Sequence, residues 1–193
     1  MKFTKTSIDG IVIIDPNVFG DHRGYFLESY NEKEFKEVIF KVSFVQDNES
    51  KSSKGVLRGL HFQKPPFEQS KLVRCIEGKV LDVAVDIRKG SPTYGKWVAY
   101  ILSDENHHQL FIPPGFAHGF CVLSDYADFE YKCTDLYNPD FEVGLLWSDT
   151  DLNIDWPISN PFVSEKDKAN PLLKNLDDKL LPIYDEEGNG EKY

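Results

Sequence analysis

The sequence is poor in basic residues, in cysteine and in long apolar runs. Its 193 residues carry a formal net charge of -10, which excludes the extended basic surface that binds nucleic acid or an anionic membrane. A small anionic ligand can still be bound by a few local cations. No apolar run is long enough to span a membrane, and none follows the amino terminus as a signal peptide requires. We therefore expect a cytoplasmic protein with no nucleic-acid or membrane partner.

The cysteines give no sign of a disulfide framework. Cys75, Cys121 and Cys133 are an odd number, they lack CxxC spacing, and each lies in an apolar, strand-like segment. Such residues are typical of buried free thiols in a reducing compartment.

Short apolar runs separated by turn residues are the dominant pattern, and the many aromatic residues favour β structure. The clearest run is 80–87, where an apolar residue at every second position predicts a strand with one fully apolar face. Glu77-Gly78, between two such runs, predicts a tight hairpin turn. The predicted strands are 11–14, 24–30, 44–49, 56–62, 72–76, 80–87, 97–102, 110–112, 120–123, 129–133 and 143–147.

Few helices are expected. Asn31 followed by Glu34 resembles a capping box, with Phe35, Val38 and Ile39 at helical spacing behind it. After residue 150 the chain becomes polar and rich in proline, and short helical turns are expected near 164–168 and 172–177. Residues 1–184 are interpreted as one domain, and residues 185–193 as an acidic, flexible tail.

Many evenly spaced strands and few helices predict a mainly β protein, an antiparallel β-sandwich or barrel. A cupin-type jelly roll is the leading candidate, with a few short helices in the amino-terminal region and at the carboxyl terminus. Strand propensity by itself does not separate it from other β-sandwiches.

Polar residues that interrupt strand-like segments mark the candidate site. His61 lies within an apolar run, where a lone histidine is more often a core residue than a catalyst. Arg58 and Lys71 lie in flanking strands, and burying them without an anion would cost several kcal/mol each. They are therefore either exposed or close to an anionic ligand. Gln46 and Asn48, two residues apart, point to the same side of their strand.

The spacing of Arg58 and His61 conflicts with this picture. Three residues apart, they would face opposite sides of a regular strand. A bulge or twist at Gly59 would turn both toward one side.

A metal centre is disfavoured. The stretch from Pro113 to His118 resembles the second half of a cupin metal motif, but the matching first half at His61 lacks a second histidine. Two scattered histidines do not complete a three-ligand site. His107 and His108 lie in a polar turn and are expected to be solvated.

Several ordered stretches of the sequence are specific enough to compare with known families: 46–48, 55–63, 71–74, 86–95 and 114–120. Together they resemble the dTDP-4-dehydrorhamnose 3,5-epimerase family, and the resemblance runs from about residue 3 to about residue 170. The resemblance implies a metal-free cupin jelly roll without organic cofactor, usually a homodimer, acting third in dTDP-L-rhamnose synthesis for surface polysaccharides. Its substrate would be dTDP-4-keto-6-deoxy-D-glucose.

The resemblance also implies roles for particular residues. His61 would be the general base with Asp167 as its partner carboxylate, Tyr131 the acid, and Lys71 the cation that stabilises the enolate. Arg23 and Glu28 would reach into the partner subunit's site. The full set of substrate-contacting residues implied is Arg23, Glu28, Gln46, Asn48, Arg58, His118, Glu142 and Lys166.

Other interpretations stay open at the level of sequence. Tyr131 is also consistent with half-buried packing, Asp167 with a helix cap and Lys166 with solvation. The nearest functional alternative is an epimerase that inverts one carbon, C3 or C5, of a related nucleotide deoxysugar. The others are a non-catalytic sugar-nucleotide binder and a metal-dependent cupin.

Overall fold

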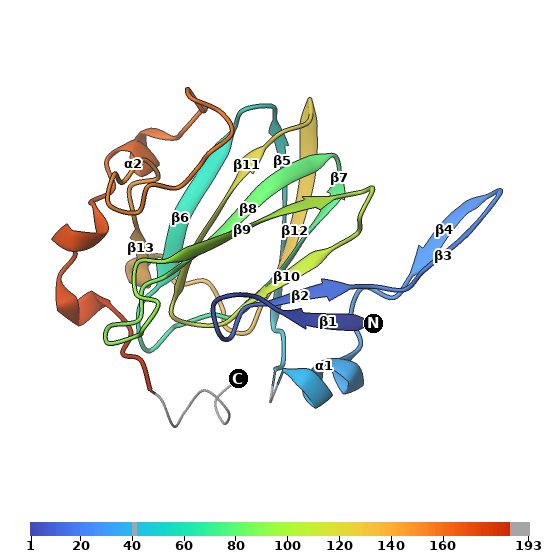
Figure 1. Cartoon of the computed structure of the whole chain (residues 1–193), viewed down its shortest axis with the longest axis horizontal. Coiled ribbons are helices and arrows are strands. Elements are labelled where there is room, and N and C mark those ends of the chain that lie inside the picture. The colour runs from blue at the N-terminus through green and yellow to red at the C-terminus, as the bar shows by residue number, and fades with distance from the viewer. Residues whose placement is uncertain (40–41, 186–193) are drawn as a thin grey trace.

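Two antiparallel sheets lie face to face in the computed structural model, which describes residues 1–39 and 42–185 (Figure 1). The six-stranded sheet has the order β1 (Lys2–Lys5), β2 (Val12–Asp15), β10 (Gln109–Ile112), β7 (Lys71–Glu77), β12 (Tyr126–Cys133) and β5 (Gln46–Ser53). The five-stranded sheet has the order β13 (Glu142–Gly144), β6 (Leu57–Gln63), β11 (Phe116–Val122), β8 (Lys79–Asp86) and β9 (Trp97–Ser103). The prediction of a mainly β, antiparallel sandwich is confirmed.

The core between the sheets is built from both of them. Val73 and Phe129 of the six-stranded sheet pack with Ala84 and Phe120 of the other, and all four are buried. Phe120 and Phe129 stack across the interface with ring centroids 4.1 Å apart. This apolar layer holds the two sheets together and supports the polar residues at its edge.

The strand β8 departs from its predicted pattern, because both of its faces are buried. Val80 and Ala84 face the core between the sheets, whereas Val83 and Val85 pack in a second cluster with carboxyl-terminal residues such as Leu173. The predicted fully apolar face, which carries Val83 and Val85, is confirmed, and the proline-rich carboxyl-terminal segment covers it (Figure 1). The opposite face, which carries Asp82 and Asp86, is buried as well.

The predicted hairpin at Glu77-Gly78 was also wrong. β7 and β8 belong to different sheets, so this turn carries the chain from one layer to the other. Gly78 has φ +84°, and a Cβ there would lie 2.2 Å from the carbonyl oxygen of Tyr126. The glycine is needed for this close crossing rather than for a two-residue turn.

The strands β1 and β3 (Val18–Asp21) were not predicted. β3 pairs with β4 (Gly24–Leu27) in a two-stranded hairpin that projects away from the sandwich (Figure 1). Its residues are largely exposed, so they lack the alternation between buried and exposed positions that predicts a strand.

The helices are short. Those that follow Asn31 and those near 164–168 and 172–177 lie where the sequence predicted them, whereas the segments at 139–141 and 178–180 were not predicted. Asn31 caps α1 (Glu32–Val38) by accepting hydrogen bonds from the backbone of Lys33 and Glu34, which confirms the cap. The side chain of Glu34 binds the amino group of Met1 at 2.8 Å instead of closing a capping box. The other helical segments are α2 (Glu165–Lys168), η1 (Pro139–Phe141), η2 (Leu173–Asn175) and η3 (Asp178–Leu180).

The three cysteines are free and buried, as expected. Burial raises the pKa of Cys75 to about 12 and that of Cys121 to about 11, so both thiols stay protonated and unreactive at neutral pH.

None of the helices within residues 1–39 and 42–185 is long and apolar enough to cross a membrane. The single-domain assignment stays a prediction, and the predicted tail lies, beyond residue 185, outside the described residues.

Candidate active site

A cavity of about 550 Å³ is lined by residues of both sheets and of α2, and a smaller one of about 290 Å³ adjoins it. His61, Lys71 and Tyr131 line both cavities, so they form the boundary between the two. The larger cavity is also lined by Arg58, His118, Lys166 and Asp167, and the smaller one by Gln46, Asn48 and Glu142. The fold thus gathers ten of the twelve predicted site residues from strands and a helix that are far apart in the sequence.

The strand β6 places Arg58 and His61 on the same cavity by a β-bulge. Against β11, His61 pairs with His118 while Arg58 pairs with Phe120, so three steps on β6 oppose two on β11. Gly59 has φ +110°, and a Cβ on it would lie 2.6 Å from the Cα of Gly119. The irregularity expected at Gly59 is confirmed.

His61 and Asp167 form a close hydrogen-bonded pair at the cavity. His61 Nε2 and Asp167 Oδ1 are 2.6 Å apart, and Asp167 is buried. Burial by itself would raise the pKa of Asp167. The hydrogen bond and charge of His61, together with a hydrogen bond to Ser164, hold this pKa below its usual value. Ser164, not Asp167, caps α2, accepting from the Asp167 backbone N–H at 3.1 Å.

Lys71 and Tyr131 meet at the junction of the two cavities. The Lys71 ammonium lies 5.8 Å from the centroid of the Tyr131 ring. Burial lowers the pKa of Lys71, because the charged ammonium loses water. Burial also raises the pKa of Tyr131, so its hydroxyl keeps its proton at neutral pH and can donate it.

The smaller cavity presents carboxamides from the edge strand β5. Gln46 Nε2 donates to Asn48 Oδ1 at 2.9 Å, and Gln46 Oε1 accepts from the backbone of Tyr137 at 3.0 Å. Asn48 Nδ2 in turn contacts Cys133 Sγ at 3.7 Å. The prediction that Gln46 and Asn48 point to one side is confirmed.

The remaining charged residues surround the opening. Arg58 is exposed and its Nε donates to Ser52 Oγ at 3.0 Å, whereas Lys71 is half-buried. Glu142 lies 3.9 Å from His61 Nδ1, forms an ion pair with Lys166 and accepts from the Tyr137 hydroxyl at 3.1 Å. Burial opposes ionisation of Glu142, but Lys166 and His61 keep its pKa below the usual value.

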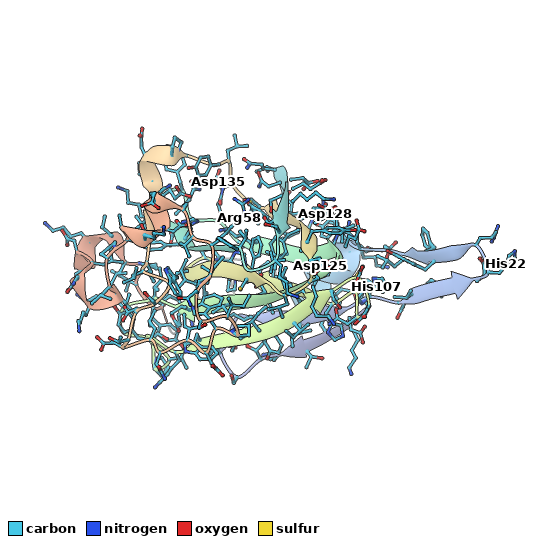
Figure 2. All side chains as sticks on the ribbon, turned by 90° about the horizontal axis from the view of Figure 1, so that it is seen from above. His22, Arg58, His107, Asp125, Asp128 and Asp135 are labelled. Carbon is cyan, nitrogen blue, oxygen red and sulfur yellow. The ribbon has the colours of Figure 1, made fainter. Side chains whose placement is uncertain are left out.

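Two predicted residues, Arg23 and Glu28, are not part of this cavity. Arg23 lies in the turn of the projecting hairpin, with 78% of its side chain exposed, and pairs with Asp21 at 2.5 Å. Glu28 accepts from Asn31 at 2.9 Å. Figure 2 shows the adjacent His22 at the tip of the hairpin, far from Arg58 on the body.

Sequence reasoning missed some residues of the site and misplaced others. Asp82 was treated as part of an apolar alternation, although a carboxylate in such a strand is itself a signal. Tyr137 follows an irregular loop and gave no signal. His107 was expected to be solvated, but it is half-buried and its ring centroid lies 4.6 Å from that of Tyr25 in the hairpin.

Metal binding finds no structural support in the described part of the chain. Within residues 1–39 and 42–185, no three His, Cys, Asp or Glu side chains gather in a group that could hold a metal ion. His61 and His118 each bind a carboxylate instead.

An antiparallel sandwich with a His–Asp pair, a half-buried lysine and a protonated tyrosine around one cavity defines a cupin-like protein equipped for proton transfer. The family model for dTDP-4-dehydrorhamnose 3,5-epimerase matches residues 5–175. The chain therefore belongs to the dTDP-4-dehydrorhamnose 3,5-epimerase family.

Individual relatives cover nearly the whole chain. The dTDP-4-dehydrorhamnose 3,5-epimerase of Shigella flexneri is 60% identical over 86% of this chain and 93% of its own length. A crystal structure of the Legionella pneumophila 3,5-epimerase in complex with dTDP-4-keto-L-rhamnose is 52% identical, with a TM-score of 0.93 over 95% of this chain and 98% of that one. A 3'-monoepimerase of Streptomyces bikiniensis bound to dTDP-quinovose is 34% identical, with a TM-score of 0.88 over 93% and 92%.

Proposed function

We propose that this chain is an isomerase that inverts C3 and C5 of dTDP-4-keto-6-deoxy-D-glucose to give dTDP-4-keto-L-rhamnose, in the synthesis of dTDP-L-rhamnose. The observation that carries this proposal is the His61–Asp167 pair, 2.6 Å apart, on a cavity that Lys71 and Tyr131 also line. The relatives support two inversions rather than one: the double epimerase of Shigella flexneri is 60% identical, whereas the 3-epimerase of Streptomyces niveus is 40% identical.

The proposed reaction begins with removal of a proton beside the ketone. His61 is the base, because imidazole accepts a proton near neutral pH and is regenerated afterwards. Asp167 binds Nε2, which leaves Nδ1 to take the proton and gives the resulting imidazolium a buried counter-charge. The electron pair of the broken C–H bond moves to the keto oxygen and forms an enolate.

Lys71 stabilises that enolate, because a cation placed where negative charge develops lowers the barrier. Tyr131 returns a proton to the carbon from the other face, and its raised pKa keeps the hydroxyl protonated until then. The same two proton transfers at the second carbon complete the double inversion. Neither inversion needs a metal ion or an organic cofactor.

The nucleotide is held by the polar residues around the reacting centre. The cations Arg58 and Lys166 provide charge for the diphosphate, which explains local positive charge in a protein of net charge -10. Gln46 and Asn48 offer amide groups for hydrogen bonds, and His118 and Glu142 complete the set of contacts.

A homodimer in the cytoplasm is part of the proposal. Arg23 and Glu28 are outside the cavity of their own chain, and they lie on or just after a hairpin that projects from the body. In a dimer, the hairpin of one subunit would bring both residues to the site of the other.

Incubation with dTDP-4-keto-6-deoxyglucose in heavy water tests the proposal. Mass spectrometry is expected to find two deuterons incorporated, one at each carbon beside the ketone. NMR after reduction of the product would then assign their positions and stereochemistry. One deuteron would indicate a single-site epimerase, and none, with dTDP binding intact, would contradict the proposed substrate.

A further inference from the structure

Asp82 is a buried carboxylate beneath the cavity that the reaction described above does not use. It lies in the middle of β8, it is 0% exposed, and its strand neighbours Leu81 and Val83 are apolar. A carboxylate in such a position is costly unless a partner compensates its charge. Its contacts therefore indicate why this position is not apolar.

Asp82 binds the inner nitrogen of His118. Asp82 Oδ2 and His118 Nε2 are 2.8 Å apart, and both residues are buried. An ionised carboxylate only accepts hydrogen bonds, so Nε2 carries the proton. His118 Nδ1 has no hydrogen-bond partner among the described residues, and the ring borders the larger cavity, directly across from His61 in the β6–β11 register.

Asp82 also acts on the Lys71 ammonium. Burial lowers the pKa of Lys71, while the negative charges of the Glu142 and Asp82 carboxylates oppose that shift. The other titratable side chains that line the cavities with Lys71 are Tyr131, His61, His118, Asp167, Glu49, Arg58, Lys166 and Tyr137. Asp82 Oδ1 has no hydrogen-bond partner in the described part of the chain, so its charge is not neutralised by a donor there.

We propose that Asp82 is a positioning residue for the epimerase reaction: its carboxylate fixes the His118 imidazole with Nδ1 toward the cavity and supplies negative charge that favours the Lys71 ammonium. The inference rests on the proposed function. Asp82 is not among the residues that line the two cavities. It acts through a histidine placed to contact the sugar and through the lysine that stabilises the enolate.

The variant Asp82→Asn tests this role because it keeps the shape and removes the charge. We expect kcat to fall about 10²-fold, as for a misplaced catalytic group, with little change in KM. Without the carboxylate, the pKa of Lys71 falls further, so the alkaline limb of the kcat profile moves to lower pH. In a His118→Asn background, Asp82→Asn is expected to cause a smaller further loss, because its effect through His118 is already gone.

Asp86→Asn is the matched control. Asp86 lies on the same strand, is also 0% exposed, and is bound by Arg88, Ser91 and Thr93 rather than by a cavity residue. Its loss is expected to lower the Tm and leave the alkaline limb in place. The proposal is overturned if Asp82→Asn leaves both kcat and the alkaline limb of the kcat profile unchanged. It is also overturned if the variant lowers the Tm and kcat but leaves the alkaline limb in place, because a purely structural residue would have that effect.

A wild-type measurement covers the case in which Asp82→Asn does not fold. In protein labelled with 15N-histidine, NMR is expected to show the His118 Nε2 protonated, and a bare Nε2 with a protonated Nδ1 would overturn the proposal. Failure of the proposed function is distinguishable, because wild type would then incorporate no deuterium into dTDP-4-keto-6-deoxyglucose. Two deuterons with an unaffected Asp82→Asn variant would reject only the role of Asp82.

Discussion

At the residue scale, the site depends on burial acting in opposite directions on acids and bases. Burial lowers the pKa of Lys71 and raises that of Tyr131, whereas ion pairing holds Asp167 and Glu142 ionised despite burial. Titratable groups whose environments move their pKa values apart are suited to different roles in one reaction. The single-residue predictions below follow from these differences.

Tyr131→Phe tests the proposed acid. Loss of the hydroxyl removes the proton donor but little packing, so we expect kcat to fall by about 10²-fold or more, with dTDP affinity retained. The matched control is Tyr126→Phe on the same strand, whose hydroxyl binds Glu77 away from the cavity. Wild-type turnover in Tyr131→Phe, measured by deuterium uptake, would place the acid elsewhere.

Asp167→Asn tests the buried pair through stability. The folded state lowers the pKa of Asp167, so its carboxylate stabilises the fold above the unfolded pKa of about 4 and loses that contribution as pH falls through the folded value. We expect the unfolding free energy of the variant to be about 2 kcal/mol lower than that of wild type at pH 7. This gap between the two proteins is expected to narrow below about pH 4.

Urea unfolding at several pH values measures that gap. Glu165→Gln, in the same helical turn but with an exposed side chain paired to Lys168, should change little at any pH. A gap of constant size from pH 7 to pH 3 would show that the Asp167 charge does not contribute.

At the element scale, the docking of α2 decides whether Asp167 reaches His61. Gly144 of β13 lies opposite His61 in the β6–β13 register, and the Asn170 side chain packs directly on it. A Cβ on Gly144 would lie 2.2 Å from Asn170 Nδ2. Because Asn170 follows α2 closely, this contact sets the distance between the helix and the strand that carries His61.

Gly144→Ala is therefore expected to displace α2 and to lower both stability, by about 1–3 kcal/mol, and kcat. The double variant Gly144→Ala/Asn170→Ala removes the three atoms that lie nearest to the new Cβ and should recover most of the loss. Thermal unfolding and deuterium uptake measure the two effects. Equal losses in the single and double variants would exclude this contact as the cause.

At the scale of the whole molecule, the projecting hairpin is unexplained by a single subunit. Phe19 and Phe26, a cross-strand pair, are 64% and 68% exposed. A two-stranded hairpin with exposed aromatics is only marginally stable without a further packing surface. The proposed homodimer supplies that surface and also brings Arg23 into a site.

Phe26→Asp tests the homodimer. A charge in the hairpin is expected to convert dimer to monomer in light scattering and to weaken dTDP binding, since Arg23 and Glu28 leave the partner's site. Ile183→Asp, at an 82% exposed position on the body, should remain dimeric and bind dTDP normally. A monomeric wild type that binds dTDP would contradict the arrangement.

The sequence by itself determined the class of fold, the helices α1 and α2, and ten of the residues that line the two cavities. Period-2 apolar runs and the Asn31 cap are local signals, and they were confirmed because local backbone preferences agree with the final packing. The family resemblance, carried by ordered motifs such as 55–63 and 114–120, is confirmed by the match of the family model over residues 5–175.

Only the tertiary structure decided which faces are buried and which side chains meet. Glu77-Gly78 links two layers instead of two paired strands, and both faces of β8 are covered, because burial depends on segments distant in sequence. Arg58 and His61 face the same cavity only because Gly59 approaches Gly119 closely. The partners of His61 and His118 lie on α2 and β8, 106 and 36 residues away, at distances along the chain that no local pattern spans.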